Sequence, residues 1–326
     1  MPLFDLPLAD LESYRPDVRR PDDLDEFWRT TLDEARALAE PPRIERVETG
    51  LRLVETWDLE FSGFGGHRIR AWMHVPADAT GPLPAIVQYH GYSGGRGSAW
   101  NNHLYAEAGY VHIIMDTRGQ GWSTINATPD PGADGDPAVP GVMTRGIRDP
   151  HSYYYRRAYT DAALLVDAAR SLEQVDASRV AVAGVSQGGG LAIAAAGLST
   201  GLAGALVDVP FLCHFERALS ITDGMPYAEI LAYLARYRDR IDEVQHTLSY
   251  VDGVNLAATA STPTLFSVAL RDVTCPPSTV FAAFNAWGHD DREIAVFPFN
   301  AHEGGAEHHL PAQLAFLARV LEGETR

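Results

Sequence analysis

Cysteine is scarce in this sequence, because the 326 residues contain only Cys213 and Cys275. The two lie far apart along the chain and form neither a Cys-x-x-Cys pair nor a Cys/His metal-binding pattern. A framework of several disulfides is therefore excluded. We expect two buried free thiols, although the sequence alone leaves a single disulfide open.

Long apolar runs and basic clusters are also missing. No run of about 18 apolar residues occurs, so the sequence predicts no membrane-spanning helix. The first ten residues carry acid where a secretory signal would carry base, and we expect a cytoplasmic protein. Lys and Arg total 26 against 43 Asp and Glu, which gives a formal net charge of -17. Such a charge repels phosphate backbones and anionic lipids, so neither nucleic acid nor membrane is an expected partner.

The composition is that of a folded globular protein. Hydrophobic residues make up 46% and charged residues 21%, and there is neither an internal repeat nor a low-complexity tract. The length would allow two average domains, but it also fits one large α/β domain with insertions. We expect a single domain over 1–326, with an N-terminal extension over 1–45 and a helical insertion over about 211–250.

The most informative stretch is a Gly-x-Ser-x-Gly motif between a short apolar strand and an alanine-rich helix. Its central residue is Ser186, flanked by Gly184 and Gly188. In a tight strand-to-helix turn, a Cβ at the flanking positions would clash, and the serine hydroxyl is exposed at the edge of the sheet. This nucleophile elbow makes Ser186 the candidate nucleophile, whereas the motif alone could be an ordinary glycine turn.

A serine nucleophile needs a base, and the base needs a carboxylate that orients it. In α/β-hydrolase folds the chain order is Ser, then Asp or Glu, then His. Asp272 directly follows an expected strand over 263–270, and His302 follows another over 293–297. Both positions are carboxyl ends of strands, where reactive groups gather in such sheets. We therefore predict Asp272 and His302 as the partners of Ser186.

Other acids and histidines in this part of the chain are weaker candidates. Asp290, Asp291 and His289 precede the last strand and would lie at the opposite edge of the sheet. His308 and His309 open the C-terminal helix, and we expect them to be solvated caps.

Two backbone N–H groups must stabilise the negative charge that develops on the attacked carbonyl oxygen. Gln187, directly after the nucleophile, provides one. The segment His90-Gly-Tyr-Ser-Gly-Gly95 follows an expected strand over 85–89, and the amide of Tyr92 is the second candidate. Its alternative is a plain glycine turn. Ser93 is not a credible rival nucleophile, because no strand–elbow–helix pattern exposes it.

The remaining pattern predicts an antiparallel lead followed by a parallel sheet. Alternating apolar residues over 51–61 and 67–75 indicate a hairpin, and fully apolar runs at 85–87 and 111–115 indicate strands covered on both faces. Helices are expected over 158–172, 278–287 and 310–321, and a further strand over 203–209. The predicted fold is therefore a doubly wound, mostly parallel α/β-hydrolase sheet.

Two segments interrupt this alternation. The loop over 122–150 is rich in Gly, Pro and Asp, and its length favours a functional surface. The insertion over 211–250 contains an apolar stripe of Ile230, Leu231, Leu234 and Tyr237, which we expect to contribute to contacts between subunits. Arg118 cannot transfer protons, and we expect its guanidinium to pair with a carboxylate beneath the site rather than to contact substrate.

Several motifs together resemble the acetyl xylan esterase and cephalosporin C deacetylase family, the seventh family of carbohydrate esterases. They occur in the family's order over most of the chain: Tyr89–Gly95, Asp116–Gly121, Met143–Gly146, Gly184–Gly189, Val209–Cys213, Thr247–Val254, Cys275–Phe281 and His302–Gly305. The sequence departs from the family pattern in Trp122-Ser-Thr after Gly121 and in Val185, where glycine is common.

The resemblance implies a serine esterase with the triad Ser186, Asp272 and His302 and the oxyanion donors Tyr92 and Gln187. It also implies an intracellular hexamer built as a trimer of dimers, with no metal and no cofactor. Implied substrates are small acetylated xylo-oligosaccharides and sugars and the acetyl group of cephalosporin C. We expect bulk from Tyr92, Pro210 and Phe211 to close the acyl pocket around an acetyl group.

Three alternatives stay open at this point. A general short-chain carboxylesterase would share all of these residues. A peptidase would share the triad but usually carries a large additional domain, for which this chain has little room. A non-catalytic binding protein of the same fold commonly lacks triad residues, which this sequence retains.

Overall fold

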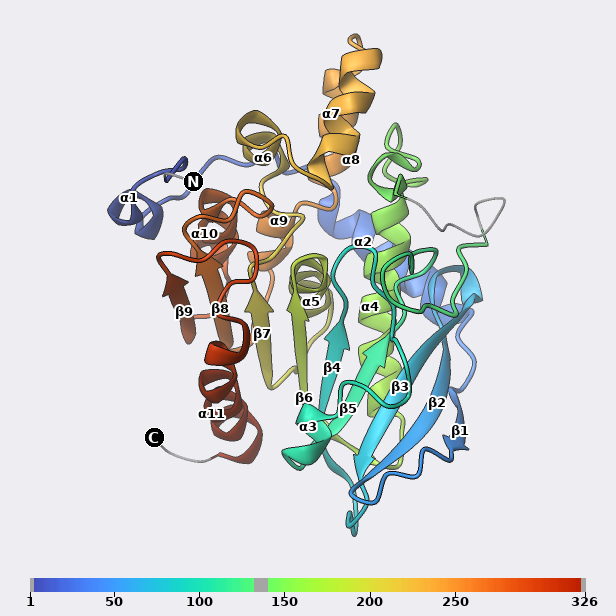
Figure 1. The fold of residues 1–326 in the computed structure, drawn as a ribbon. Coiled ribbons are helices and arrows are strands. Elements are labelled where there is room, and N and C mark those ends of the chain that lie inside the picture. Colours follow the sequence, from blue (N-terminus) through green and yellow to red (C-terminus); the bar gives the residue numbers. More distant parts are fainter. Residues whose placement is uncertain (1–2, 132–139, 324–326) are drawn as a thin grey trace.

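The computed structural model describes residues 3–131 and 140–323, and a mixed sheet organises them. Within this part of the chain the sheet has nine strands, in the order β1-β2-β3-β5-β4-β6-β7-β8-β9 (Figure 1). The strands are β1 (Arg43–Val47), β2 (Val54–Ser62), β3 (Arg68–Pro76), β4 (Leu83–Tyr89), β5 (Val111–Met115), β6 (Val175–Val185), β7 (Gly204–Asp208), β8 (Thr264–Ala269) and β9 (Arg292–Phe297).

Strand direction changes along the sheet as the sequence predicted. β1, β2, β3 and β5 pair antiparallel, whereas β5, β4, β6, β7, β8 and β9 pair parallel in that order. The central strands are buried on both faces, which explains their unbroken apolar sequences. The predicted fold class, a doubly wound and mostly parallel sheet with an antiparallel lead, is confirmed.

Helices cover both faces of the sheet. They are α1 (Leu8–Glu12), α2 (Leu24–Ala37), α3 (Leu104–Glu107), α4 (Tyr154–Arg170), α5 (Gln187–Leu198), α6 (Phe215–Ile221), α7 (Tyr227–Arg236), α8 (Ile241–Ser249), α9 (Gly253–Ala257), α10 (Pro277–Ala286) and α11 (Leu310–Glu322). Short 3-10 turns lie at Phe64–Gly66, Val142–Thr144 and Ala306–His309. The larger core lies under α4, α5 and α10, and a second core lies under α3 and α11. None of the described helices has both the length and the hydropathy needed to cross a membrane.

Some local expectations were wrong. The expected first strand of the hairpin began at residue 51, but Leu51 and Leu53 are exposed and β2 begins at Val54. The edge strand β1 was not predicted, because its side chains are mostly exposed and show no alternation. His309 was expected as a solvated cap, yet it is only 4% exposed, because its ring packs against Asp208 at the end of β7 and Phe297 at the end of β9.

The insertion over 211–250 folds into α6, α7 and α8, and in Figure 1 α7 projects from the top of the molecule. The predicted apolar stripe of α7 is only partly available to another subunit. Ile230 is fully buried in the core of its own chain, and Leu234 packs partly against that core. Leu231 is half-buried and Tyr237 is exposed. The prediction of an exposed apolar stripe was therefore wrong in part, because the first turn of α7 packs inward.

Candidate functional site

The serine of the elbow sits in a strained turn between β6 and α5. Ser186 has φ 59° and ψ -122°, a conformation that a side-chain-bearing residue adopts only under local constraint. The packing explains the glycines on either side. A Cβ on Gly184 would lie 2.0 Å from the carbonyl oxygen of Gly188, and one on Gly188 would lie 2.1 Å from that of Tyr89. Only glycine fits these two positions.

The structure brings Ser186, His302 and Asp272 into one hydrogen-bonded chain. The Ser186 Oγ lies 3.0 Å from the His302 Nε2, and the His302 Nδ1 lies 2.8 Å from the Asp272 Oδ2. Asp272 is fully buried, while the His302 side chain is 35% exposed. Groups of the kinds that serve as nucleophile, base and orienting carboxylate thus lie within reach of one another, with the imidazole partly open to solvent.

The carboxylate of Asp272 is held on both oxygens. Its Oδ1 accepts hydrogen bonds from the backbone N–H groups of Thr274 and Cys275, at 2.8 and 2.9 Å. The Oδ2 is thereby left to face His302. This arrangement fixes the imidazole with Nδ1–H toward Asp272 and leaves Nε2 to accept the serine proton.

The segment after β4 lies against the nucleophile. A Cβ on Gly91 would lie 3.9 Å from the Ser186 Cβ, so the next residue, Tyr92, is close to the elbow. Gln187 is the first residue of α5, where N–H groups have no acceptor inside the helix. His90 is half-buried, and desolvation of its ring lowers its pKa to about 4, so this imidazole is neutral near pH 7.

A network of buried amide and phenol groups supports this segment, and the sequence did not predict it. The Gln120 Nε2 donates to the Gln187 Oε1 at 2.8 Å, while the Gln120 Oε1 accepts from the Ser93 backbone N–H at 2.7 Å. Tyr154 and Tyr155 complete the network through their hydroxyls. Gln120 thus ties the segment after β4 to the start of α5. In the sequence, the Arg118-Gly-Gln-Gly motif contains this glutamine, and it is the one local pattern that could have pointed to it.

The insertion reaches this segment through Glu229. The Tyr92 hydroxyl donates to the Glu229 carboxylate, which also accepts from the Met143 N–H at 3.1 Å. The Tyr92 ring meets Trp122 edge to face at 5.3 Å. Burial and the neighbouring carboxylate raise the pKa of Tyr92, so its hydroxyl is neutral. Glu229 lies 137 residues from Tyr92 in sequence, and no local pattern links the two.

The two other predicted pocket residues lie behind the nucleophile. Pro210 and Phe211 are both buried, and the Phe211 N–H donates to the Ser186 carbonyl oxygen at 2.9 Å. The Phe211 ring packs against Tyr227 of α7, with centroids 4.4 Å apart. Their backbone therefore adjoins Ser186, and their role in an acyl pocket stays a prediction.

Arg118 lies beneath the site and is completely buried. Its Nε and Nη2 donate to the two oxygens of Asp161 at 2.6 and 2.7 Å, and its Nη1 lies 3.5 Å from Asp130. The expected pairing with a carboxylate is what the structure contains. Direct contact with substrate is excluded by its burial.

Both cysteines are buried and free. Cys275 belongs to the one group of metal-ligating side chains found among the described residues, together with Asp272 and His302, whose ligand atoms lie within 4.8 Å of one another. In this group the carboxylate and the imidazole already bond to each other, and the imidazole also contacts Ser186. The expectation of a metal-free site stays a prediction.

Comparison with known proteins places these observations in a family. The family model described as acetyl xylan esterase matches residues 1–320. Among solved structures, an acetyl xylan esterase from Paenibacillus sp. R4 is 39% identical with a TM-score of 0.89, covering 97% of this chain and 100% of that chain. Acetyl xylan esterase 1 from Thermoanaerobacterium sp. JW/SL YS485 is 34% identical with a TM-score of 0.88, covering 96% and 99%.

A curated relative is longer than this chain. Acetyl esterase Axe7A from Xylanibacter ruminicola is 25% identical over 297 residues, which are 89% of this chain but only 65% of that protein. The chain thus spans somewhat less than two thirds of this relative.

Proposed function

Because this chain belongs to the acetyl xylan esterase family, we propose that it is a carboxylic ester hydrolase that removes acetyl groups with Ser186 as nucleophile. One observation carries the proposal. The Ser186 Oγ, both ring nitrogens of His302 and the Asp272 carboxylate form a continuous hydrogen-bonded chain at the carboxyl edge of the sheet. This is the arrangement that acyl transfer through a serine requires.

The proposed reaction has two steps. The His302 Nε2 accepts the Ser186 proton as Oγ attacks the acetyl carbonyl, and the N–H groups of Tyr92 and Gln187 stabilise the resulting oxyanion. His302 then donates that proton to the departing alcohol, which leaves an acetyl group on Ser186. In the second step His302 takes a proton from water, the hydroxide attacks the acetyl-enzyme, and acetate departs as Ser186 regains its proton.

The proposed substrates are small acetylated carbohydrates, namely acetylated sugars and xylo-oligosaccharides, with the acetyl group of cephalosporin C as a further substrate. Support comes from the two similar solved structures, which are acetyl xylan esterases, and from the family resemblance of the sequence. We further propose a cytoplasmic homo-oligomer, a hexamer built as a trimer of dimers, that needs no cofactor. The two free thiols fit a reducing compartment.

A fluorophosphonate probe tests the serine mechanism directly. It reacts with a serine only when a base activates that serine. We expect labelling that mass spectrometry maps to Ser186 and that His302→Ala abolishes, with Asp290→Asn as an unaffected control at the opposite edge. A folded protein that stays unlabelled would contradict the proposal and favour a non-catalytic binding protein.

A further inference from the structure

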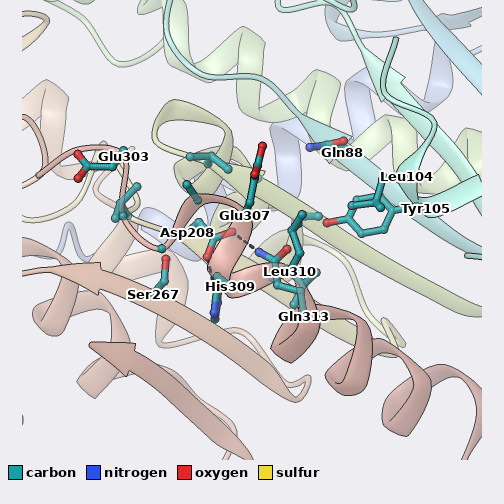
Figure 2. A pocket seen from close by; sticks show the side chains of 18 of the residues that line it. Gln88, Leu104, Tyr105, Asp208, Ser267, Glu303, Glu307, His309, Leu310 and Gln313 are labelled. Atoms are coloured by element: carbon teal, nitrogen blue, oxygen red, sulfur yellow. Dashed lines mark hydrogen bonds and ion pairs between the residues drawn. The ribbon is translucent and has the colours of Figure 1, made fainter. Parts of the chain in front are cut away.

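A separate cavity of about 370 Å³ lies next to the proposed site, at the carboxyl edge of the sheet (Figure 2). Its walls come from the ends of β6 and β7, from the turn after His302 and from α3 and α11. Val185 and Glu303, the sequence neighbours of Ser186 and His302, line it, whereas the lining set of described residues includes neither Ser186 nor His302. The volume falls in the lower part of the range of small-molecule sites, about 300–1,000 Å³.

Two buried polar atoms beside this cavity face each other as a long ion pair, without a regular hydrogen bond within the described residues. They are the Asp208 Oδ1 and the His309 Nε2, which lie 3.4 Å apart. The His309 side chain is 5% exposed and that of Asp208 is 14% exposed. The other Asp208 oxygen accepts from the Gln313 amide, as the dashed line in Figure 2 shows. The Ser267 hydroxyl also bonds the Asp208 carboxylate, which has no Lys or Arg beside it among the described lining residues, so a further hydrogen-bond donor from a ligand would stabilise it.

The lining also limits the class of ligand. Among the described residues it contains the carboxylates of Asp208 and Glu307 and no Lys or Arg, so it disfavours anions. Leu104, Leu310 and the ring of Tyr105 add an apolar wall, and the Tyr105 hydroxyl points into the cavity in Figure 2. Acceptor groups opposite an apolar wall suit a ring that carries several hydroxyl groups and has apolar C–H faces.

The same backbone forms the cavity and holds the proposed catalytic groups. The Asp208 carbonyl oxygen accepts the Ser186 N–H at 2.9 Å. Gly304, two residues after His302, packs against the residue that follows β7 so closely that a Cβ there would lie 3.1 Å from the Val209 Cγ1. A molecule in the cavity would therefore contact the chain segments that position Ser186 and His302.

We propose that this cavity is a second binding site, distinct from the esterase site, for a neutral monosaccharide such as the pentose unit of a deacetylated product. Its occupancy changes the turnover rate without competing for the esterase site. The choice of a sugar rests on the proposed function, because that reaction would supply the ligand. The donors would be sugar hydroxyls directed at the carboxylates of Asp208 and Glu307.

The experiment measures binding of D-xylose while the esterase site is blocked. Wild-type protein is phosphonylated at Ser186 and titrated with D-xylose by calorimetry. We expect saturable binding, weakened about tenfold or more in Asp208→Asn because one charged acceptor is lost. Leu104→Trp, at a partly exposed wall residue, should abolish binding by filling the cavity, whereas Asp290→Asn should bind like wild type. Leu104→Trp keeps the test valid if Asp208→Asn does not fold.

A kinetic readout separates this site from the first. With p-nitrophenyl acetate as substrate, D-xylose should change kcat and leave KM unaltered, and Leu104→Trp should remove that effect. Absence of binding, binding that Leu104→Trp does not reduce, or binding of methylammonium in place of xylose would each overturn the inference. If Ser186 is not labelled, the proposed function fails, but the titration of unlabelled protein and of Leu104→Trp still decides whether the cavity binds sugar.

Discussion

The hydroxyl of Ser186 differs from that of Ser93, the nearby serine that also has a positive φ, in what it faces. The Ser186 Oγ contacts the His302 imidazole, whereas the Ser93 Oγ lies 2.7 Å from the Ser123 hydroxyl. A hydroxyl neighbour cannot act as the base that a serine nucleophile needs. Backbone strain alone therefore does not mark a nucleophile, and the imidazole within reach does.

Tyr92 leads to a prediction about acyl length. Its hydroxyl is held by Glu229 and its ring by Trp122, and we propose that it forms a rigid wall of the acyl pocket. Each added methylene of the acyl group should then cost about 1–3 kcal/mol, roughly ten- to two-hundredfold in kcat/KM. We expect kcat/KM to fall steeply from p-nitrophenyl acetate to butyrate and octanoate.

Substitution of Tyr92 provides the control for the series of p-nitrophenyl esters. Tyr92→Ala keeps the backbone N–H and should raise the butyrate-to-acetate ratio of kcat/KM by about tenfold or more. Trp100→Ala, at an exposed position, should leave the ratio unchanged. Equal or rising kcat/KM along the wild-type series would indicate a general carboxylesterase.

At the scale of elements, Arg118 links the end of β5 to α4 and to the segment that contains Asp130. All three side chains are completely buried. Removing one partner of a buried ion pair typically costs about 3–5 kcal/mol, because it leaves a buried charge uncompensated. We predict that Arg118→Met lowers the free energy of unfolding by about this amount, as measured by urea denaturation.

Arg29 provides a matched control for Arg118. It also pairs with two carboxylates, Glu26 and Asp33, but all three side chains are well exposed. Exposed pairs contribute about 0–1 kcal/mol, so Arg29→Met should change stability little. Similar small losses in both variants would show that Arg118 does not hold these elements together.

The sequence predicted those elements whose residue types are dictated by their place in the sheet. Buried parallel strands give continuous apolar runs, and the elbow requires glycine, so β4 to β8 and the turn at Ser186 could be placed. The chain order of the α/β-hydrolase fold then selected Asp272 and His302. These inferences depend on local sequence or on topology.

What the sequence could not predict depends on contacts between distant segments. β1 pairs with β2 through backbone hydrogen bonds, and its exposed side chains show no apolar pattern that would reveal this pairing in the sequence. His309 is buried because α11 returns beneath β7, and Glu229 meets Tyr92 only once the insertion has folded over the site. Polar residues in such positions look like surface residues until the tertiary structure is known.

At the scale of the whole molecule, the exposed end of α7 leads to a prediction about assembly. We propose that Leu231, Leu234 and Tyr237 take part in contacts between subunits, since a projecting helix with apolar side chains favours a partner. Light scattering should give a mass several times 35.5 kDa. A combined Leu234→Asp and Tyr237→Asp variant should reduce that mass.

The control is Leu38→Asp, because Leu38 is 58% exposed but lies at the end of α2, outside α7. It should not change the assembly. A mass near 35.5 kDa for the wild type at micromolar concentration would contradict the oligomer.

Four histidines with lowered pKa values should make the free energy of unfolding decrease at acidic pH. Burial lowers the pKa of His74 and His112 to about 3 and that of His90 and His214 to about 4. In the unfolded chain their pKa is about 6.5, so unfolding below that pH takes up protons. The stability that these neutral histidines contribute is present above pH 6.5 and is lost as pH falls toward 4 and 3.

Urea denaturation between pH 7 and pH 4.5 measures this effect. Each buried histidine adds up to about 1.4 kcal/mol per pH unit to the slope of the free energy of unfolding. His74→Gln should reduce the slope by about one such contribution, and His308→Gln, at an exposed position, should not. A free energy of unfolding that stays constant over this range would show that these groups titrate alike in both states.

The central claim is that Ser186 attacks the acetyl ester after His302 takes its proton. The most direct measurement is kcat/KM for p-nitrophenyl acetate in Ser186→Ala, with the fold checked by circular dichroism. Loss of a nucleophile that acts together with its base typically costs several orders of magnitude, on the order of 10⁶ in kcat. We predict such a loss in Ser186→Ala, whereas hydrolysis at the wild-type rate by the folded variant would contradict the account.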